Sequence, residues 1–301
     1  MKRILILYTA VENTQWNDEV GGKVVSRIIQ CLESKYAVHA HVFTGFQGLE
    51  KLVETYDLVF NLCYGYYSEK ERVNITQTYI TYWLDTRGIS HTTSLFPSAI
   101  KALDKGKYFE LCANIEGLYS VPMYGTDKII QKPRYGGCGR DVAMYEDEKL
   151  CPSLKKDFIQ QTYIEGRELS VFTVLGKVLK PYEVKTKFIK SIGDSDKERY
   201  ILEMKSDITL DPKLDDEVLA NLYRVVKELH EVNKFVGITR LDLIVESTFQ
   251  HLYLLDINIC PSIGEFNSML AWSLHNNNLK YSETILKVVA NFIKKSCDDS
   301  E

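Results

Sequence analysis

Short apolar runs alternate with helical patterns over the first third of the chain. The apolar runs predict three strands, at 4–8, 37–43 and 58–62. The patterns between them predict two helices, at 19–35 and 49–54. This alternation is typical of a parallel sheet, because parallel neighbours are joined by long crossover connections that usually contain a helix. A helix over 74–86, closed by Gly88, and a short strand over 89–92 complete a first unit that we expect to span residues 1–96.

The rest of the chain predicts a mixture of helices and antiparallel strands. Two successive helices are expected between residue 97 and about residue 126. Later apolar runs predict strands at 128–133, 158–164, 169–175 and 178–186, and the polar stretch 191–199 is expected to be an exposed loop. A helix over 215–232, a β-hairpin over 237–259 and two closing helices follow. We therefore expect a small central unit over residues 97–165 and a C-terminal unit over residues 166–301.

The predicted hairpin carries polar side chains on one face. Successive side chains of a strand point to opposite faces, so Arg240 shares a face with Asp242, and Asp256 shares a face with Asn258. A turn centred on Phe249 pairs residue 242 with 256 and residue 240 with 258. The two aspartates then face each other across an antiparallel pair, where side chains lie about 5 Å apart and like charges destabilise. A positive charge is therefore expected between them.

Two interpretations of this acidic pair stay open. Two carboxylates and an amide oxygen are hard ligands that suit Mg²⁺, with phosphate oxygens and water completing its shell. Alternatively, Arg240 pairs with the acids on an exposed face of the hairpin. The opposite face is apolar, which indicates that the hairpin packs on a core and that its polar face lines a cleft; the apolar face carries Leu241, Leu243, Val245, Tyr253, Leu255 and Ile257.

A second candidate site follows the strand over 128–133. Lys132 precedes a glycine-rich stretch whose backbone N–H groups suit an anion, formed by Gly136, Gly137, Cys138 and Gly139. The stretch matches neither a P-loop nor a dinucleotide-binding fingerprint, and an ordinary surface turn is the open alternative. Glu168, after a turn at Gly166, suits ribose hydroxyls or a salt bridge with a neighbouring base. Lys185 has the same two interpretations as a phosphate contact or a surface charge.

Composition excludes several classes of protein. The chain of 301 residues is 45% hydrophobic and 26% charged, which is ordinary for a globular protein. A formal net charge of −4 provides no general positive field to hold a nucleic acid. No apolar run approaches the roughly 20 residues of a membrane span, and we see no signal-peptide pattern. We expect a cytoplasmic protein with no nucleic-acid or membrane partner, and the scattered seven cysteines indicate neither disulfides nor structural zinc.

Five motifs, taken in order, resemble the ATP-grasp superfamily and within it the D-alanine–D-alanine ligases. These motifs lie at 102–105, 130–133 with its glycine loop, 163–168, 240–242 and 255–261. Residues 59–61 with Gly65 and Glu69 resemble the first-domain motif of that family, so the likeness extends over nearly the whole chain. The resemblance implies an α/β (α+β) ATP-grasp fold with three lobes. These are an N-terminal parallel α/β domain, a small central α+β domain and a C-terminal antiparallel-sheet domain, with ATP between the last two.

The resemblance also implies a set of ATP contacts. Lys105 and Lys132 match the two lysines that hold the phosphates, and the loop of Gly136, Gly137 and Cys138 closes over them. The segment that contacts adenine corresponds to Gln161, Tyr163 and Ile164. Glu168 matches the ribose acceptor, and Lys185 matches a further lysine that contacts phosphate.

The metal and catalytic positions follow from the same resemblance. Asp242, Asp256 and Asn258 match the ligands of Mg²⁺, of which we expect two ions, with Mn²⁺ as a substitute. Arg240 matches the arginine that stabilises the phosphorylated intermediate and the oxyanion, together with a backbone N–H near Ser262. The implied chemistry is transfer of the γ-phosphoryl group to a carboxylate, followed by attack of an amine on the acyl phosphate.

The substrate half departs from the family pattern. Residues 9–13 replace the glycine pair, serine and glutamate that bind the first amino acid, and Tyr64 stands where a histidine is usual. The segment 264–268, which ends at Ser268, only loosely matches the one that binds the acceptor carboxylate. The residues that remain as substrate contacts are Glu12, Tyr64, Glu69, Ser262 and Ser268.

These observations predict an ATP-dependent ligase that joins a small, amino-acid-like carboxylate to an amine. D-alanine–D-alanine ligation is the narrower alternative. A small-molecule kinase that stops after phosphoryl transfer is a second alternative, and a nucleotide-binding module without turnover is a third. The expected partners are small-molecule substrates and, by analogy with the family, a second copy of the chain in a homodimer.

Overall fold

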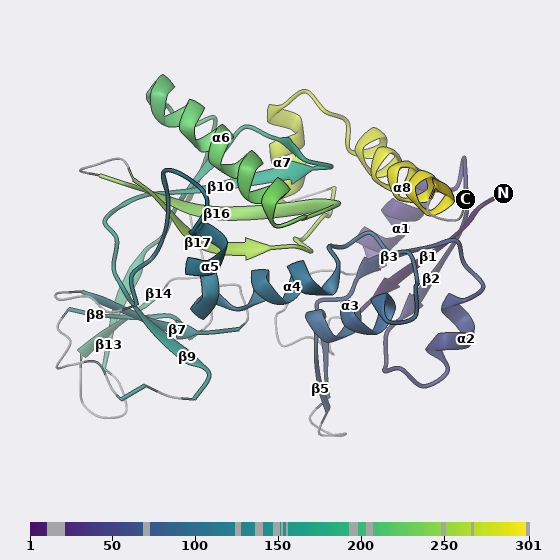
Figure 1. The fold of residues 1–301 in the computed structure, drawn as a ribbon, viewed down its shortest axis with the longest axis horizontal. Helices are drawn as coiled ribbons and strands as arrows, with labels where there is room; N and C mark the ends of the chain where they lie inside the picture. The colour runs from purple at the N-terminus through teal and green to yellow at the C-terminus, as the bar shows by residue number, and fades with distance from the viewer. Residues whose placement is uncertain are drawn as a thin grey trace.

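The computed structural model contains, in the residues that it describes, four β-sheets connected and covered by helices (Figure 1). It describes residues 1–10, 22–68, 73–123, 128–135, 141–146, 151, 153–154, 156–192, 198–202, 207–247, 251–265 and 268–298. In these residues no helix is both long and apolar enough to cross a membrane.

The N-terminal part forms the predicted parallel sheet. Its strands are β1 (Arg3–Tyr8), β2 (Ala37–Val42) and β3 (Leu58–Leu62), in the order β2-β1-β3. The helices α1 (Gly22–Leu32) and α2 (Leu49–Val53) lie in the crossover connections. Ile4 and Ile6 of β1 pack in one core cluster, whereas Leu5 and Leu7 pack in another, so this strand is buried on both faces. That double burial explains why its sequence is an unbroken apolar run.

The helix predicted over 74–86 begins later than expected. A two-stranded hairpin of β4 (Gly65–Ser68) and β5 (Val73–Thr76) precedes α3 (Gln77–Asp85). The Thr76 hydroxyl accepts a hydrogen bond from the backbone N–H of Tyr79 at 3.2 Å and so caps the helix. Gly65 is required where the strands pair, because its φ is +123° and an added Cβ would lie 2.8 Å from the Ile75 carbonyl oxygen. The predicted strand over 89–92 forms only a single bridge, from His91 to Val59.

A seven-stranded sheet carries the C-terminal part of the chain. Its main order is β15-β12-β10-β16-β17-β6, and β11 pairs with β10. The bounds are β6 (Leu118–Ser120), β10 (Gly166–Val174), β11 (Lys177–Val178), β12 (Tyr182–Lys185), β15 (Asp207–Leu210), β16 (Ile238–Glu246) and β17 (Leu252–Asn258). The run predicted as one strand over 178–186 is therefore divided between β11 and β12. Strand β6 is too short to show a periodic pattern and was not predicted.

A five-stranded sheet forms the central part, in the order β13-β14-β8-β7-β9. Its strands are β7 (Ile129–Pro133), β8 (Ala143–Tyr145), β9 (Phe158–Thr162), β13 (Phe188–Ile192) and β14 (Glu198–Leu202). The exposed loop predicted over 191–199 is wrong at both ends, because β13 and β14 pair there; residues 193–197 lie outside the described part. The chain thus returns to this sheet after building part of the seven-stranded one. The predicted lobe boundaries at residues 97 and 165 stay predictions.

Helices connect and cover these sheets. The predicted pair after residue 97 is α4 (Phe96–Leu103) and α5 (Tyr108–Cys112), with the 3₁₀ turn η2 (Lys105–Lys107) between them. The long helix α6 (Asp216–Val232) packs through Leu222, Val225 and Leu229 in the same core cluster as β10, β16 and β17. The two closing helices are α7 (Met269–Asn276) and α8 (Tyr281–Asp298).

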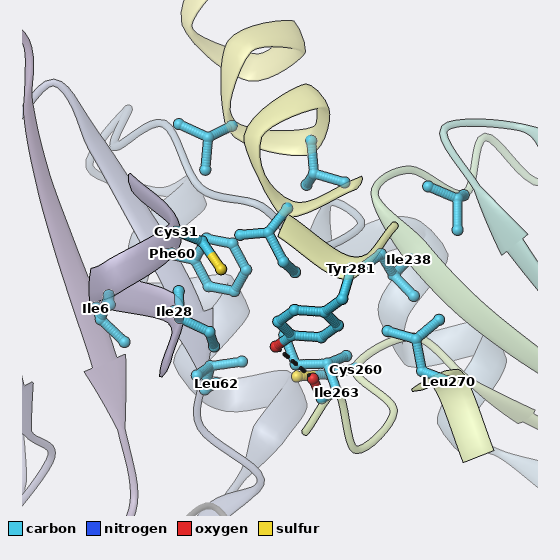
Figure 2. Close-up of a cluster of buried hydrophobic side chains, with 14 of the residues drawn as sticks. Ile6, Ile28, Cys31, Phe60, Leu62, Ile238, Cys260, Ile263, Leu270 and Tyr281 are labelled. Atoms are coloured by element: carbon cyan, nitrogen blue, oxygen red, sulfur yellow. Dashed lines mark hydrogen bonds between the residues drawn. The ribbon is translucent and has the colours of Figure 1, made fainter. Parts of the chain in front are cut away.

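One hydrophobic cluster joins the N-terminal sheet to the C-terminal end of the chain (Figure 2). Ile6, Ile28 and Phe60 meet Ile238, Cys260 and Tyr281 in it. The Tyr281 hydroxyl donates a hydrogen bond of 2.6 Å to the Ile263 carbonyl, so this buried polar group is paired. The segment that follows β17 is therefore held between α8 and the N-terminal sheet.

His230, near the C-terminal end of α6, is buried against the seven-stranded sheet. His230 Nδ1 lies 3.0 Å from the Thr173 hydroxyl, which lies 2.5 Å from the Thr239 hydroxyl. Burial lowers the pKa of His230 below its ordinary 6.5, and the charge of Glu231 offsets this only in part.

We expect acid to destabilise the protein through His230. Below about pH 6.5 the unfolded chain binds a proton that the folded chain accepts only at lower pH, so the free energy of unfolding falls as the pH falls. Urea unfolding at pH 7.5 and 5.5 measures this difference. His230→Gln reduces it, and His275→Gln, at an exposed histidine, leaves it unchanged. Equal pH dependence in His230→Gln and the wild type would refute the assignment.

Candidate functional site

In the part of the β16–β17 hairpin that lies far from its turn, the residues pair as the sequence predicts. Asp242 pairs with Asp256, and Arg240 pairs with Asn258. Side chains of directly opposed residues lie on the same face of a sheet, so the two carboxylates and the Asn258 amide share one face.

From Leu243 toward the turn, the predicted register is wrong by one residue. A β-bulge between Asp242 and Leu243 shifts the pairing, so Leu243 pairs with Leu254 rather than with Leu255. Leu254 and Leu252 are consequently buried in the core, whereas Leu255 and Tyr253 are only half-buried. The bulge leaves the apolar face of β16 intact and changes which residues of β17 cover it.

The Asp242 carboxylate is bound on both oxygens. Arg240 donates from Nε to Oδ1 at 3.0 Å and from Nη2 to Oδ2 at 2.9 Å, which is the two-pronged geometry that a guanidinium favours. The Ser170 hydroxyl donates a further bond of 2.5 Å to Oδ1. Ser170 reaches this carboxylate because its strand, β10, pairs residue 170 with residue 242. Arg240 therefore supplies one of the positive charges expected between the aspartates.

Electrostatics keep Arg240 charged. Burial alone lowers the pKa of its guanidinium, but the negative charge and hydrogen bonds of Asp242 outweigh it, so the pKa is raised above its ordinary value. Tyr182 lies in the same buried environment, where its hydroxyl hydrogen-bonds with Ser170 and burial raises its pKa above the ordinary 10.

The Asp256 carboxylate is bound from a different side. Lys105 Nζ lies 3.0 Å from Oδ1, the Tyr108 hydroxyl lies 3.0 Å from the same oxygen, and the backbone N–H of Ile257 donates to it at 3.0 Å. Lys105 is itself buried, with 7% of its surface exposed. Each aspartate of the facing pair is thus neutralised by a separate cation.

A clamp fixes the turn that presents Lys105. Arg134 donates from Nε and Nη2 to the two oxygens of Asp104, at 2.6 and 2.8 Å. The Asp104 carboxylate also accepts from the backbone N–H of Gly106 at 3.1 Å, and the Lys105 N–H donates to the Arg134 carbonyl at 3.2 Å. The 3₁₀ turn after α4 is therefore attached to the end of β7.

The same strand β7 carries Lys132, which donates to the Leu255 carbonyl at 3.4 Å. Burial and the neighbouring Lys105 charge lower the pKa of Lys132 to about 8, against the favourable charges of Asp256 and Glu168. Glu168 shows the opposite shift, because burial and the Asp242 charge raise its pKa to about 7, although Thr186 hydrogen-bonds with it. The two lysines, Glu168 and the aspartates thus form one electrostatically coupled cluster.

The residues predicted for adenine lie at the end of β9 in the five-stranded sheet. Gln161 is buried, pairs with Ile130 and donates from its side chain to the Val121 carbonyl at 3.2 Å. The Tyr163 ring packs edge-to-face against Phe188, with centroids 6.4 Å apart. Ile164 follows directly and is half-buried.

The remaining predicted residues are scattered. Lys185 is exposed. Its neighbour Val184 lies opposite Glu168 and shares a face of the sheet with it, so Lys185 lies on the other face and its phosphate role stays a prediction. Tyr64 is buried and Ser262 is half-buried. The Ser268 hydroxyl caps α7 by accepting from Ala271 N–H at 3.1 Å and also donates to the Gly264 carbonyl. The other candidates lie outside the described residues; they are Glu12, Glu69, Gly136, Gly137 and Cys138.

Three residues of the cluster were not found by sequence reasoning. Ser170 and Tyr182 lie on neighbouring strands, and only the pairing of β10 with β12 and β16 brings them to Asp242. Tyr108 lies three residues after Lys105, and this spacing on a 3₁₀ turn is a signal that was available, because residues i and i+3 then lie on one face.

The donor chemistry of this face fits a divalent cation that prefers oxygen. Asp256 and Asn258 supply a carboxylate and an amide oxygen, and Asp242 supplies a second carboxylate that Arg240 shares. Within the described residues there is no group of three or more His, Cys, Asp and Glu side chains that could hold a metal alone. Two carboxylates and one amide oxygen would fill only part of an octahedral shell, so an ion such as Mg²⁺ held here would keep water and substrate phosphates as its other ligands.

Comparison with known proteins gives one family and several related folds. A family model described as an ATP-grasp domain matches residues 110–261. No curated protein sequence matches the chain.

Solved structures match the chain over nearly its full length. The D-alanine–D-alanine ligase from Bacillus anthracis is 15% identical, with 99% of each chain covered and a TM-score of 0.72. The same ligase complexed with ATP is 14% identical, with 99% of each chain covered and a TM-score of 0.73. The VanG D-Ala:D-Ser ligase from Enterococcus faecalis is 14% identical, covering 97% of this chain and 99% of that one, with a TM-score of 0.72. At these identities the likeness concerns the fold, and it confirms the fold class that the sequence predicts.

We expect Asp242→Asn to weaken the folded state. The substitution leaves the Arg240 guanidinium without its charged partner, and the free energy of unfolding falls by about 2–3 kcal/mol. Glu183→Gln is the matched control, because Glu183 also binds an arginine on two oxygens, yet that Arg167 side chain is 39% exposed. Its loss is expected to be below about 1 kcal/mol. Urea unfolding compares the two, and equal losses would contradict the account.

Proposed function

This chain belongs to the ATP-grasp family, and from that premise we propose that it is an ATP-dependent carboxylate–amine ligase that forms an amide or peptide bond. One observation carries the proposal. Lys105 and Lys132 come from separate elements and both reach β17, at Asp256 and at the carbonyl of Leu255. Two buried ammonium groups beside facing carboxylates suit a triphosphate and a divalent cation together, because the ammonium groups attract phosphate oxygens and the carboxylates attract the cation.

ATP binding is assigned to the cluster and to the adjoining sheet. Lys105 and Lys132 hold the phosphates, and the loop of Gly136, Gly137 and Cys138 closes over them. Gln161, Tyr163 and Ile164 contact adenine. Glu168 accepts hydrogen bonds from the ribose hydroxyls, and its raised pKa of about 7 makes the ionised form depend on pH near neutrality.

Asp242, Asp256 and Asn258 would hold Mg²⁺, as two ions or with Mn²⁺ in place of Mg²⁺. The cation, when bound, neutralises charge that spreads over the transferred phosphoryl group. Lys105 then exchanges its partner, Asp256, for a phosphate oxygen. Arg240 stays bound to Asp242 through two of its five N–H donors, and the others face developing negative charge.

The proposed chemistry begins with a carboxylate that an amine cannot attack, since oxide would have to leave. A carboxylate oxygen bonds to the γ-phosphorus and the bond to ADP breaks, which gives an acyl phosphate. The amine nitrogen then bonds to the acyl carbon, loses a proton, and inorganic phosphate departs. Arg240, a backbone N–H near Ser262 and Lys185 are assigned to stabilising the negative charge. Positioning and electrostatics supply the catalysis, and no protein nucleophile takes part.

The acid and the amine are proposed only as a class. D-alanine–D-alanine ligation is the narrower candidate, and it is the activity of the Bacillus anthracis ligase whose fold this chain shares. Against it, the Ser268 hydroxyl is committed to capping α7, and Glu265 near it binds Arg27 of α1 on both carboxylate oxygens. These contacts leave fewer hydrogen-bond donors to bind the carboxylate of an acceptor substrate. Glu12, Tyr64, Glu69 and Ser262 stay as candidate substrate contacts, and the homodimer and cytoplasmic location stay predictions.

We expect ADP release that requires a carboxylate substrate. A coupled assay across amino acids and amines, with D-alanine alone among them, measures it. Hydroxylamine replaces the amine and traps the acyl phosphate as a hydroxamate, which a phosphorylated alcohol does not form. Turnover with D-alanine alone supports the narrow candidate, and turnover only with other pairs supports the broad one. ADP release without hydroxamate under any condition would refute the ligase and favour a kinase.

A further inference from the structure

The contacts of the Asp256 carboxylate are unevenly distributed between its two oxygens. Among the described residues, the ammonium of Lys105, the hydroxyl of Tyr108 and the N–H of Ile257 all meet Oδ1, each at 3.0 Å. The carboxylate of Asp242 differs, because Arg240 binds one of its oxygens with each of two nitrogens. Three donors on a single oxygen fix the rotation of the Asp256 side chain and leave Oδ2 as the oxygen available to a cation.

Tyr108 reaches Oδ1 because of its place in the chain. It begins α5 directly after the 3₁₀ turn η2, three residues after Lys105, so the two side chains lie on the same side of the turn. Its ring is buried, with 1% of the residue exposed, in the core cluster that also contains Leu118 and Ile257. The turn itself is held by the Asp104–Arg134 pair. The hydroxyl therefore has little freedom to leave Asp256.

The hydroxyl has one proton and two acceptors within reach. The Ala102 carbonyl lies at 2.8 Å and Asp256 Oδ1 at 3.0 Å, and the Ile257 N–H donates to the hydroxyl at 3.1 Å. A carboxylate is the stronger acceptor, because hydrogen bonds to an ionised group are about twice as strong as neutral ones. The proton consequently favours Asp256, and the Ile257 N–H ties the hydroxyl and the carboxylate together.

We propose that Tyr108 is a positioning residue for the metal site: it holds Asp256 by Oδ1 and so presents Oδ2 to a divalent cation. The inference rests on the proposed function, which makes Asp256 a metal ligand. The Tyr108 hydroxyl becomes more important when nucleotide binds, because Lys105 then contacts a phosphate. Oδ1 of Asp256 keeps only the Tyr108 hydroxyl and the Ile257 N–H. Tyr108 itself touches neither substrate nor cation.

Tyr108→Phe tests this role, because it removes the hydroxyl and keeps the buried ring. The matched control is Tyr281→Phe, which removes a buried hydroxyl that donates to the Ile263 carbonyl, away from Asp256. Mn²⁺ is titrated into each protein with a non-hydrolysable ATP analogue present, and free Mn²⁺ is counted by electron paramagnetic resonance. The measurements are made well below the midpoint of thermal unfolding of each variant, which is recorded separately.

We expect Tyr108→Phe to raise the Kd for Mn²⁺ about tenfold, the lower end of the effect of removing a partner that orients a metal ligand. Binding of the analogue in EDTA changes less than twofold, since that binding needs the lysines rather than the carboxylate. Tyr281→Phe leaves both constants unchanged.

The outcomes separate the inference from the function beneath it. If the wild type shows no Mn²⁺ binding that depends on the analogue, the proposed nucleotide site is wrong and the inference falls with it. If the wild type binds and Tyr108→Phe binds equally well, only the inference is overturned, even where the variant is less stable. A tenfold loss of Mn²⁺ affinity that Tyr281→Phe shares would also overturn the inference, because the effect would then come from a general loss of stability.

Discussion

Two like charges held face to face across an antiparallel strand pair are the constraint on which the site depends. Asp242 and Asp256 are neighbours on β16 and β17, and such a pair destabilises a sheet unless cations lie beside it. The structure supplies two cations from different directions. Arg240 comes from the same strand as Asp242, and Lys105 comes from a turn that is distant in the sequence. The need to neutralise this pair therefore joins the seven-stranded sheet to the segment before the five-stranded one.

Other features follow from the same requirement. The Asp104–Arg134 clamp holds the turn that carries Lys105, and the bulge beside Asp242 lies next to the Leu255 carbonyl that Lys132 contacts. Burial and the charge of Asp242 raise the pKa of Glu168 to about 7, whereas burial and the charge of Lys105 lower the pKa of Lys132 to about 8. Groups whose protonation is this finely balanced are common where a protein binds a charged substrate.

Sequence reasoning succeeded where a pattern was local and periodic. The parallel N-terminal sheet, α6 and the pairing of Asp242 with Asp256 all follow from the spacing of apolar and polar residues. It failed where distant segments decide the outcome. Three residues suffice for β6 because β17 already offers an edge. Both ends of the polar run 191–199 lie in paired strands, β13 and β14, because β8 lies beside β14. The contacts of Ser170 and Tyr182 likewise depend on the pairing of β10 with β12 and β16, which no local pattern encodes.

A crystal structure with Mn²⁺ and a non-hydrolysable ATP analogue tests the central claim most directly, because the anomalous signal of manganese locates the ion independently of any assumed ligand. The account predicts an anomalous peak bound by Asp242, Asp256 and Asn258, with the analogue phosphates between it and Lys105 and with the Lys105–Asp256 ion pair broken. A peak on other residues, or phosphates elsewhere with that ion pair intact, would contradict it.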